Sequence, residues 1–256
     1  MPRTPDELRL LVEEYLERLE LTAELGTLAT SMRYALAGGG KRIRPVLCLA
    51  VGEAVGADAA ALLPAAAAVE LVHSFSLVHD DLPSLDDDAV RRGRPSTWAA
   101  HGEATAILAG DALLAEAIRL ALSYPSTAVA RELVAATIAM IGGQQLDLEG
   151  ADDLEGLHRL KTGALFRASV LCALWAAEVP PDEHPAWRAF ADELGLLFQV
   201  VDDLLDGDGY VATVGEDGAR RLAVATAARA RGSLDAVPGE TAVLAGIVAE
   251  LASRTA

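Results

Sequence analysis

The 256-residue sequence is poor in cysteine and in aromatic residues. Its two cysteines, Cys48 and Cys172, lie far apart among apolar neighbours and form no C-x-x-C spacing. They are predicted to be reduced core residues rather than a redox or metal site. Aromatic residues make up only 4% of the chain, whereas alanine is abundant. This composition favours closely packed helices over sheets, whose strands prefer aromatic and β-branched residues.

The sequence also lacks a long uncharged apolar run. A membrane-spanning helix needs roughly 18 to 20 such residues, and the longest stretches, such as Leu133 to Leu146, are interrupted or too short. Residues 1–20 alternate charge and leucine at helical spacing, which is typical of neither a signal peptide nor a transit peptide. The sequence therefore predicts no membrane insertion and a cytoplasmic location.

Basic residues are too few to balance the acidic ones, and the formal net charge is −17. Nucleic-acid binding draws its affinity from clustered lysine and arginine, so a nucleic-acid partner is not expected. A cationic partner fits this charge better. With 52% hydrophobic residues and a mean hydropathy of +0.28, the chain can bury a substantial core.

The chain reads as apolar helical stretches separated by short glycine- and proline-containing breaks, with no linker and no repeat. Residues 203–218 alone have the glycine and aspartate density of a loop. We predict an all-α fold, a single-domain bundle of roughly ten or more helices over residues 1–256. The predicted breaks are residues 38–40, Pro64, 93–95, 124–125, 142–143, 180–181, 206–209 and 237–239.

Five carboxylates fall within nine residues directly after the apolar stretch 69–78. They are Asp80, Asp81 and residues 86–88. Adjacent carboxylates repel, and their desolvation is costly unless a cation is close, so the cluster is either a solvated turn or a metal site. Its abrupt position after an apolar helix favours the metal site. Because Pro83 lacks an amide hydrogen, it should kink or end the helix, which joint ligation by Asp80 and Asp86 requires.

A second acidic group follows another apolar helical pattern. Asp202 and Asp206 are four residues apart and thus share one helix face, where their charges repel. A divalent cation would relieve that repulsion. Oxygen ligands without a histidine or cysteine cluster indicate Mg²⁺ rather than zinc.

The cations are distributed unevenly. The chain has 19 arginines but only two lysines, Lys41 in GGGKRIRP and Lys161 in HRLKTGAL. A compact ammonium is therefore expected to be needed at these two positions, and GGGKRIRP is a plausible diphosphate seat. The arginines of RRGR at 91–94 could hold phosphate oxygens or simply neutralise the aspartates. His73, two turns before Asp80, could be a core residue or a site residue.

Six motifs occur in the order seen in trans-isoprenyl diphosphate synthases. The chain resembles this family from about Met32 to Asp206, and is most similar to the short-chain bacterial branch that includes farnesyl diphosphate synthase. The motifs are GGGKRIRP, ELVHSFSLVHDDLPSLDDDAVRRGRP, GEATAILAGDALL, GGQQLDLEG, HRLKTGAL and LGLLFQVVDDLLD.

The resemblance implies a role for each matching residue. The implied substrates are isopentenyl diphosphate and an allylic diphosphate, and the implied assembly is a homodimer. Implied Mg²⁺ ligands are Asp80, Asp86 and Asp202, supported by Asp81 and Asp206, with three ions bridged to the allylic diphosphate. Implied isopentenyl-site residues are Lys41, Arg44, His73 and Arg92. Implied allylic-site residues are Arg91, Lys161, Thr162 and Gln199, with Lys161, Thr162 and Gln199 stabilising the allylic cation.

Product length in this family is limited by residues beneath the first aspartates. Phe75 lies five residues before Asp80, next to Ser76, and an aromatic side chain there resembles the arrangement that stops elongation at fifteen carbons. Farnesyl diphosphate is the predicted product, with geranyl or geranylgeranyl diphosphate as alternatives. Phe75 is also an ordinary core residue type.

The resemblance ends after Asp206. The family usually continues with a loop carrying two further lysines that clamp the allylic diphosphate, but no lysine follows Lys161 here. Arg220 or Arg221 are candidate substitutes without the family's spacing. Trp98 and His101 also differ from the usual pattern. A non-catalytic or partner-dependent synthase-like subunit is the main alternative, although such a chain has no reason to keep both acidic groups and both lysines.

Two further interpretations are weaker. A prenyl-diphosphate cyclase would have no use for GGGKRIRP in a one-substrate reaction. A calcium-binding loop aligned on Gly209 would place Leu204 and Gly215 at ligand positions that require carboxylates.

Overall fold

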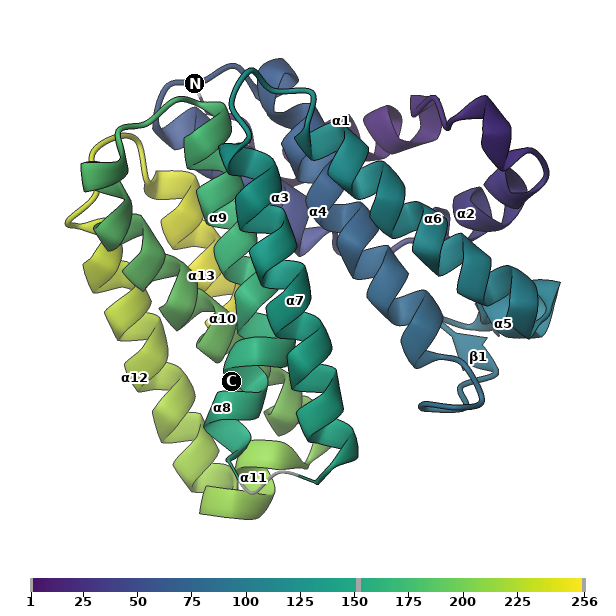
Figure 1. The fold of residues 1–256 in the computed structure, drawn as a ribbon. Helices are drawn as coiled ribbons and strands as arrows, with labels where there is room; N and C mark the ends of the chain where they lie inside the picture. The colour runs from purple at the N-terminus through teal and green to yellow at the C-terminus, as the bar shows by residue number, and fades with distance from the viewer. Residues whose placement is uncertain (1, 151–152, 255–256) are drawn as a thin grey trace.

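The computed structural model describes residues 2–150 and 153–254, and it confirms the all-α prediction. Apart from one two-stranded antiparallel hairpin, the described elements are helices (Figure 1). In chain order they are α1 (Pro5–Arg18), η1 (Ala23–Leu25), α2 (Leu28–Leu36), α3 (Ile43–Ala54), α4 (Ala59–Asp80), β1 (Val90–Arg91), β2 (Arg94–Pro95), α5 (Thr97–His101), α6 (Glu103–Ala121), α7 (Ala128–Leu148), α8 (Leu154–His158), η2 (Arg159–Gly163), α9 (Ala164–Ala176), η3 (Pro181–Glu183), α10 (His184–Asp206), α11 (Gly209–Val214), α12 (Glu216–Leu234) and α13 (Ala242–Ser253).

Three apolar helices, α3, α4 and α9, form the centre of the bundle. Helix α4 packs against α3, α6 and α9, while α9 also packs against α7 and α10. Helix α9 is buried nearly all round, as expected of a helix that lacks a polar face. The core continues into α10, where Trp187 and Phe190 are fully buried. The two cysteines are free and buried, which confirms their prediction as core residues.

Helix α4 is long and apolar enough to cross a membrane by length and composition, the one such helix in the described part of the chain. In this fold it is a core helix, because 67% of its most apolar window is buried inside the protein.

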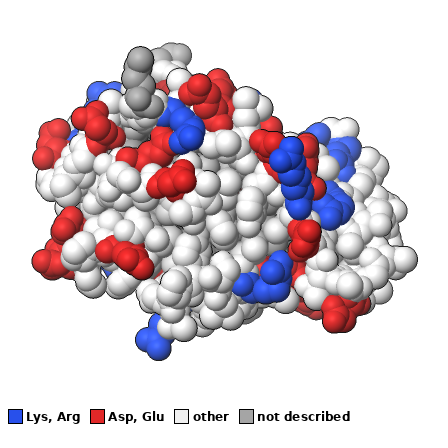
Figure 2. Space-filling view, turned by 90° about the horizontal axis from the view of Figure 1, so that it is seen from above, with Lys and Arg blue, Asp and Glu red and all other residues white. Residues whose placement is uncertain are grey.

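Charged side chains of both signs are interspersed over the face shown in Figure 2, where no continuous basic surface is visible.

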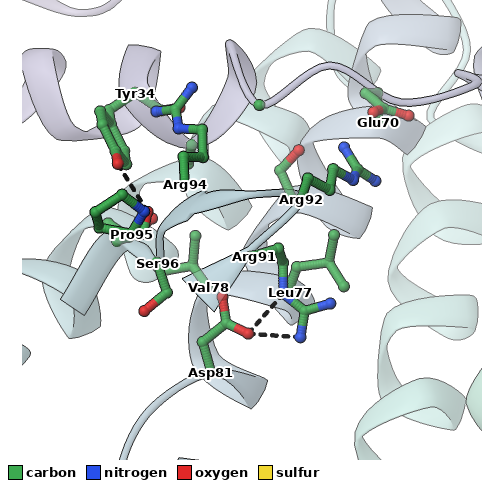
Figure 3. Close-up of a pocket in the computed structure, with 14 residues that line it drawn as sticks. Tyr34, Glu70, Leu77, Val78, Asp81, Arg91, Arg92, Arg94, Pro95 and Ser96 are labelled. Carbon is green, nitrogen blue, oxygen red and sulfur yellow. Dashed lines mark hydrogen bonds and ion pairs between the residues drawn. The ribbon is translucent and has the colours of Figure 1, made fainter. Parts of the chain in front are cut away.

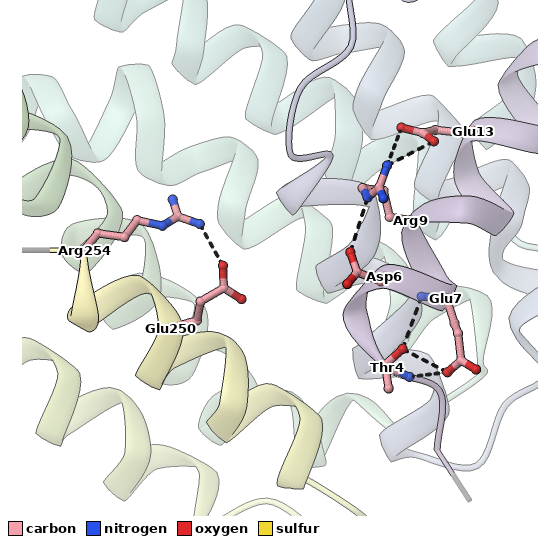
Figure 4. A network of polar contacts seen from close by, with 7 residues as sticks. All are labelled: Thr4, Asp6, Glu7, Arg9, Glu13, Glu250 and Arg254. Carbon is pink, nitrogen blue, oxygen red and sulfur yellow. Dashed lines mark hydrogen bonds and ion pairs between the residues drawn. The ribbon is translucent and has the colours of Figure 1, made fainter.

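The ends of the chain close the bundle near α3. Thr4 and Glu7 form a reciprocal capping box at the start of α1: the Glu7 amide donates to the Thr4 hydroxyl (3.3 Å) and the Thr4 amide to the Glu7 carboxylate (2.8 Å) (Figure 4). On α13, Arg254 pairs with Glu250 at 3.3 Å. The capping box stabilises the start of α1, and the ion pair lies at the end of α13. Arg254 also lines a cavity described below.

Two predicted breaks are wrong, and the loop character predicted for residues 203–218 is only partly right. Pro64 lies inside α4, and Gly142 and Gly143 lie inside α7. Residues 203–218 are mostly helical, since α10 continues to Asp206 and α11 and α12 follow after short glycine-containing junctions. Each misplaced break has a tertiary explanation.

Pro64 is tolerated because a tyrosine repairs the α4 backbone beside it. The Tyr124 hydroxyl accepts a hydrogen bond from the Ala65 amide (3.0 Å) and donates one to the Ala61 carbonyl (2.9 Å). A proline inside a helix crowds the preceding turn and kinks the backbone. The phenol hydroxyl bridges the Ala65 amide and the Ala61 carbonyl, which would bond directly to each other in a regular helix. Gly143 is required for packing: a Cβ there would lie 2.5 Å from the Lys161 amide nitrogen.

The substitution Tyr124→Phe should lower the free energy of unfolding by about 1 to 2 kcal/mol, because it leaves an amide and a carbonyl of α4 without their partner. Urea denaturation followed by circular dichroism measures the change. Tyr15→Phe is the matched control, since no hydrogen bond of its hydroxyl is found among the described residues; an equal loss in both variants would contradict this role of Tyr124.

Candidate functional site

One cavity lies between α4 and α7 and has a volume of about 360 Å³. We call it the α4–α7 cavity. Its walls are largely apolar and include Phe75, Met140 and Leu165, and its lining also contains the charged residues Asp80 and Lys161. Such a cavity can hold a hydrocarbon chain with a polar head at one end.

A second cavity, of about 490 Å³, lies between α3 and α10. We call it the α3–α10 cavity. It brings together the four cationic or titratable residues that the resemblance assigned to one diphosphate: Lys41, Arg44, His73 and Arg92. Asp202 of α10 and Arg254, which follows α13, add to its polar lining. This cavity suits a polyanion on chemical grounds.

Arg44 and His73 line both cavities and therefore lie where the two meet. The Arg44 guanidinium lies 3.5 Å from His73 Nε2 and stacks over the Phe166 ring at 4.8 Å. Burial lowers the pKa of Arg44 to about 10. Burial, together with Arg44 and neighbouring arginines, lowers the pKa of His73, so this histidine is neutral at pH 7.

The first acidic motif begins where α4 ends at Asp80, three residues before Pro83. The chain then folds back: the Asp86 amide donates to the Asp80 carbonyl (2.9 Å), and the Asp88 amide to the Asp81 carbonyl (3.1 Å). The turn also accounts for Trp98, whose indole donates to the Asp88 carbonyl at 3.0 Å. The predicted end of the helix is confirmed, and the turn brings Asp86 back toward Asp80.

The two adjacent aspartates of this motif have different environments. Asp80 lines the α4–α7 cavity, where burial, assisted by the charge of Asp86, raises its pKa to about 6 in spite of Lys161. Asp81 is only 2% exposed and accepts a hydrogen bond from Arg91 Nε at 2.6 Å (Figure 3). Arg91 therefore partners Asp81 at a small separate pocket, while Asp80 faces the larger cavity without an ion pair in the described structure.

The second acidic motif occupies the last turn of α10. Asp202 and Asp206 lie there one turn apart, and burial followed by the charge of Asp206 raises the pKa of Asp202. Gly207 ends the helix in the left-handed conformation (φ 76°). Asp80 and Asp202 thus occupy the carboxyl ends of two long helices, where the helix dipoles add to the unfavourable charge.

The protein alone does not form a complete metal cage in the described residues, where no group of three or more acidic, histidine or cysteine side chains has ligating geometry. The donors still fit a hard cation, because desolvated, mutually repelling carboxylates gain most from one. Mg²⁺ in particular is held by one or two carboxylates and completes its shell with water and substrate phosphate.

Lys161 and Thr162 lie on η2, a π-helical turn between α8 and α9. The Lys161 ammonium pairs with Asp147 at 2.5 Å, and both Lys161 and Thr162 line the α4–α7 cavity. Glycines allow two helices to press on this turn: Gly143 of α7 faces the Lys161 backbone, and a Cβ on Gly195 of α10 would lie 3.1 Å from Gly163 Cα. Such π turns often occur at functional sites.

Gln199 connects α10 to the π turn. Thr162 Oγ1 donates to Gln199 Oε1 at 2.9 Å, and Gln199 Nε2 donates to Asp203 at 2.7 Å. Asp203 in turn accepts from the Tyr210 amide at 2.8 Å. Thr162 lines the α4–α7 cavity, whereas Gln199 lines neither cavity and contacts the Thr162 hydroxyl.

Phe75 and Ser76 both line the α4–α7 cavity. The Phe75 ring contacts His79 edge-on, with ring centroids 4.9 Å apart, and Ser76 donates to the His73 carbonyl at 2.9 Å. Phe75 lies five residues before Asp80 on the same helix and is nearly buried, at 7% exposed.

Sequence reasoning missed the roles of four polar residues: Glu70, Asp147, His158 and Asp203. Glu70 forms a buried ion pair with Arg42 at 2.5 Å, and both residues belong to the lining of the α3–α10 cavity. Asp147 pairs with Lys161, and His158 lies 3.6 Å from Asp203. A signal existed only for Glu70, the single acidic residue inside the apolar run of α4; the others needed helices distant in sequence to meet.

Known proteins match this chain in sequence and in fold. The polyprenyl synthetase family profile matches residues 26–219. Farnesyl diphosphate synthase of Bacillus subtilis is 38% identical over 79% of this chain and 73% of that protein. The large subunit 1 of the chloroplastic heterodimeric geranylgeranyl pyrophosphate synthase of Arabidopsis thaliana is 43% identical over 69% of the chain, which spans only about half (53%) of it.

Among solved structures, a geranyltransferase from Legionella pneumophila superposes with a TM-score of 0.89 at 34% identity, covering 98% of this chain and 96% of that one. The family match includes both acidic motifs, and it begins before Met32 and continues past Asp206, so the resemblance is longer than predicted. This chain belongs to the polyprenyl synthetase family.

Proposed function

We propose that the protein is a short-chain trans-prenyl transferase that joins isopentenyl diphosphate to dimethylallyl or geranyl diphosphate and releases mainly farnesyl diphosphate. One observation carries the proposal: a cationic cavity meets an apolar, acid-ended cavity at Arg44 and His73. Two substrates bound in the two cavities would have their hydrocarbon ends close together. The farnesyl diphosphate synthase of B. subtilis supports the reaction class.

The chemistry follows from the position of each group. The allylic C–O bond breaks, and the electron pair leaves with diphosphate. The Thr162 oxygen and neighbouring dipoles stabilise the allylic cation. The isopentenyl double bond, held by Lys41, Arg44, His73 and Arg92 through its diphosphate, attacks that cation, and the resulting cation loses a proton to the departed diphosphate. Neutral His73 adds no extra positive charge beside the cation.

Three Mg²⁺ ions would be held by Asp80, Asp86 and Asp202, with support from Asp81 and Asp206. The ions would neutralise the charge that develops on the leaving diphosphate. The raised pKa of Asp80, about 6, fits a carboxylate that gains from a bound cation. Lys161 and Arg91 would hold the outer oxygens of the same diphosphate after exchanging their present carboxylate partners.

The region after Asp206 differs from the family's usual pattern, and residues 207–234 do not line either cavity. In place of a lysine-bearing loop, the chain forms the short helix α11, which leads directly into α12. Arg220 pairs with Glu216 on α12, and neither Arg220 nor Arg221 is among the residues that line the two cavities. Lys161 is therefore the proposed lysine contact for the allylic diphosphate.

The purified protein should convert isopentenyl diphosphate and geranyl diphosphate into a fifteen-carbon diphosphate with Mg²⁺ and give no product with EDTA. Mass spectrometry identifies the product. Asp80→Asn and Asp202→Asn should each lower kcat by at least about 100-fold, because each removes a charge that holds the metal.

Each outcome of this assay has a separate meaning. A product longer than fifteen carbons would leave the reaction intact but reject Phe75 as the floor of the cavity. Phe75→Leu tests the floor directly and should lengthen the product, with Phe190→Leu as a fully buried control away from the cavity lining. A folded protein with no product from any primer would favour a partner-dependent subunit instead.

The metal-free protein should become less stable as pH rises from about 4 to about 6. The pKa of Asp80 is raised on folding from 3.8 to about 6, so the folded state binds the proton more tightly and loses that advantage on ionisation. Asp80→Asn should raise the free energy of unfolding in EDTA at pH 7.5 by on the order of 1 to 3 kcal/mol, and by less at pH 4.5.

Urea denaturation at the two pH values measures this difference. Asp182→Asn, which removes an exposed carboxylate, is the control for loss of one negative charge. An Asp80→Asn variant that is no more stable than the parent protein at pH 7.5 would contradict the desolvation of Asp80.

We further propose a cytoplasmic homodimer. Large apolar side chains are exposed on α6 (Ile107, Leu108) and on α7 (Ile138, Ile141), and Ile141 also lines the α4–α7 cavity. A second copy that covers this face would also exclude water from a cavity where a cation forms. Sedimentation should give twice the chain mass, and Ile138→Glu should shift it toward the monomer, whereas a monomeric parent protein would reject the dimer.

A further inference from the structure

Asp203 is buried, at 3% exposed, and its carboxylate points away from both cavities into a set of hydrogen bonds. One oxygen accepts from Gln199 Nε2 (2.7 Å), and the other accepts from the Tyr210 amide (2.8 Å). Both oxygens are thus engaged by the protein. This separates Asp203 from its neighbour Asp202, which is exposed toward the α3–α10 cavity.

The carboxylate determines the direction of the next hydrogen bonds. A carboxylate only accepts, so Gln199 must turn its NH₂ toward Asp203 and its carbonyl oxygen toward Thr162. That oxygen can only accept, so the Thr162 hydroxyl must donate to it, at 2.9 Å. The hydroxyl hydrogen is therefore held behind Thr162, and the oxygen lone pairs remain for the cavity that Thr162 lines.

We propose that Asp203 is a positioning residue for cation stabilisation: through Gln199 it holds the Thr162 hydroxyl as a hydrogen-bond acceptor toward the reacting end of the α4–α7 cavity. An oxygen lone pair stabilises a developing cation, whereas a hydroxyl hydrogen in the same place would oppose it. The buried charge of Asp203 also polarises the chain of hydrogen bonds in the favourable direction. The proposal rests on the prenyl transferase function proposed above.

The fold fixes Asp203 from the side of α11 as well. The Cβ of any other residue at Gly209 would overlap the Asp203 carboxylate, and Gly209 has a positive φ of 46°. Because Gly209 has no side chain, the Tyr210 amide can approach the Asp203 carboxylate. His158 lies 3.6 Å from the same carboxylate and packs on the Tyr210 ring with centroids 5.4 Å apart. The segment that replaces the family's lysine loop therefore holds Asp203 in place.

An exchange of the two side chains tests the direction of the chain of hydrogen bonds. Asp203→Asn allows the Gln199 amide to reverse, so that Thr162 accepts and its hydrogen turns to the cavity. In the double variant Asp203→Asn/Gln199→Glu, the carboxylate stands at 199, accepts from both Thr162 and the new amide, and restores the original direction at Thr162. Asp208→Asn removes an exposed charge from the same segment and serves as the matched control.

The first-turnover rate with geranyl diphosphate, measured by rapid quench, should fall about 10- to 100-fold in Asp203→Asn, by analogy with loss of one oriented dipole. The KM for isopentenyl diphosphate should change little, because its site lies in the α3–α10 cavity. The double variant should recover to within about 10-fold of the parent protein, and Asp208→Asn should stay within about 2-fold. A double variant slower than Asp203→Asn, in folded protein, would overturn the proposal.

A second readout does not depend on turnover. An ammonium analogue of the geranyl cation, titrated calorimetrically with inorganic diphosphate and Mg²⁺, should bind about 10-fold or more weakly to Asp203→Asn and recover in the double variant. Equal binding by all variants would overturn the role of Asp203 even if the parent protein makes product. If the parent protein makes no product but binding is lost in Asp203→Asn and recovered in the double variant, the proposed reaction is rejected and the role of Asp203 is supported.

Discussion

The structure depends on the cost of holding like charges at the ends of buried apolar helices. Asp80 ends α4 and Asp202 lies in the last turn of α10, and burial raises the pKa of both. The hydrophobic packing of α4 and α10 offsets the free-energy cost of holding these carboxylates there. A divalent cation would relieve the repulsion, so carboxylates that are costly to bury are suited to the metal proposed above.

The remaining site follows from helices that approach closely around those carboxylates. Gly143 of α7 and Gly195 of α10 let their helices press on the π turn that carries Lys161 and Thr162. Arg44 and His73 then separate a cationic cavity from an apolar one. Because this wall is shared, under the proposed function the groups that would bind one diphosphate would also border the hydrocarbon of the other substrate.

The second acidic motif contains aspartates with different roles. Asp202 faces a cavity, whereas Asp203 is turned inward onto Gln199 and the α11 backbone. In the same way Asp80 faces the α4–α7 cavity while Asp81 pairs with Arg91. In each pair of neighbours one carboxylate is left for a ligand and the other orders the protein, since successive residues on a helix point in different directions.

Composition and local pattern determined the helical class, the placement of two acidic groups at the ends of apolar helices and the end of α4 before Pro83. These features depend on hydrophobic periodicity, helix propensity and local charge, which are properties of short segments and do not need contacts with the rest of the fold. Tertiary structure alone decided that Pro64 and Gly143 lie inside helices. Tyr124, distant in sequence, bridges the α4 backbone beside Pro64. The π turn packs so closely on Gly143 that a side chain there would not fit. Tertiary structure also decided which of two adjacent aspartates reaches a cavity, because that choice depends on where Arg91 and α11 pack.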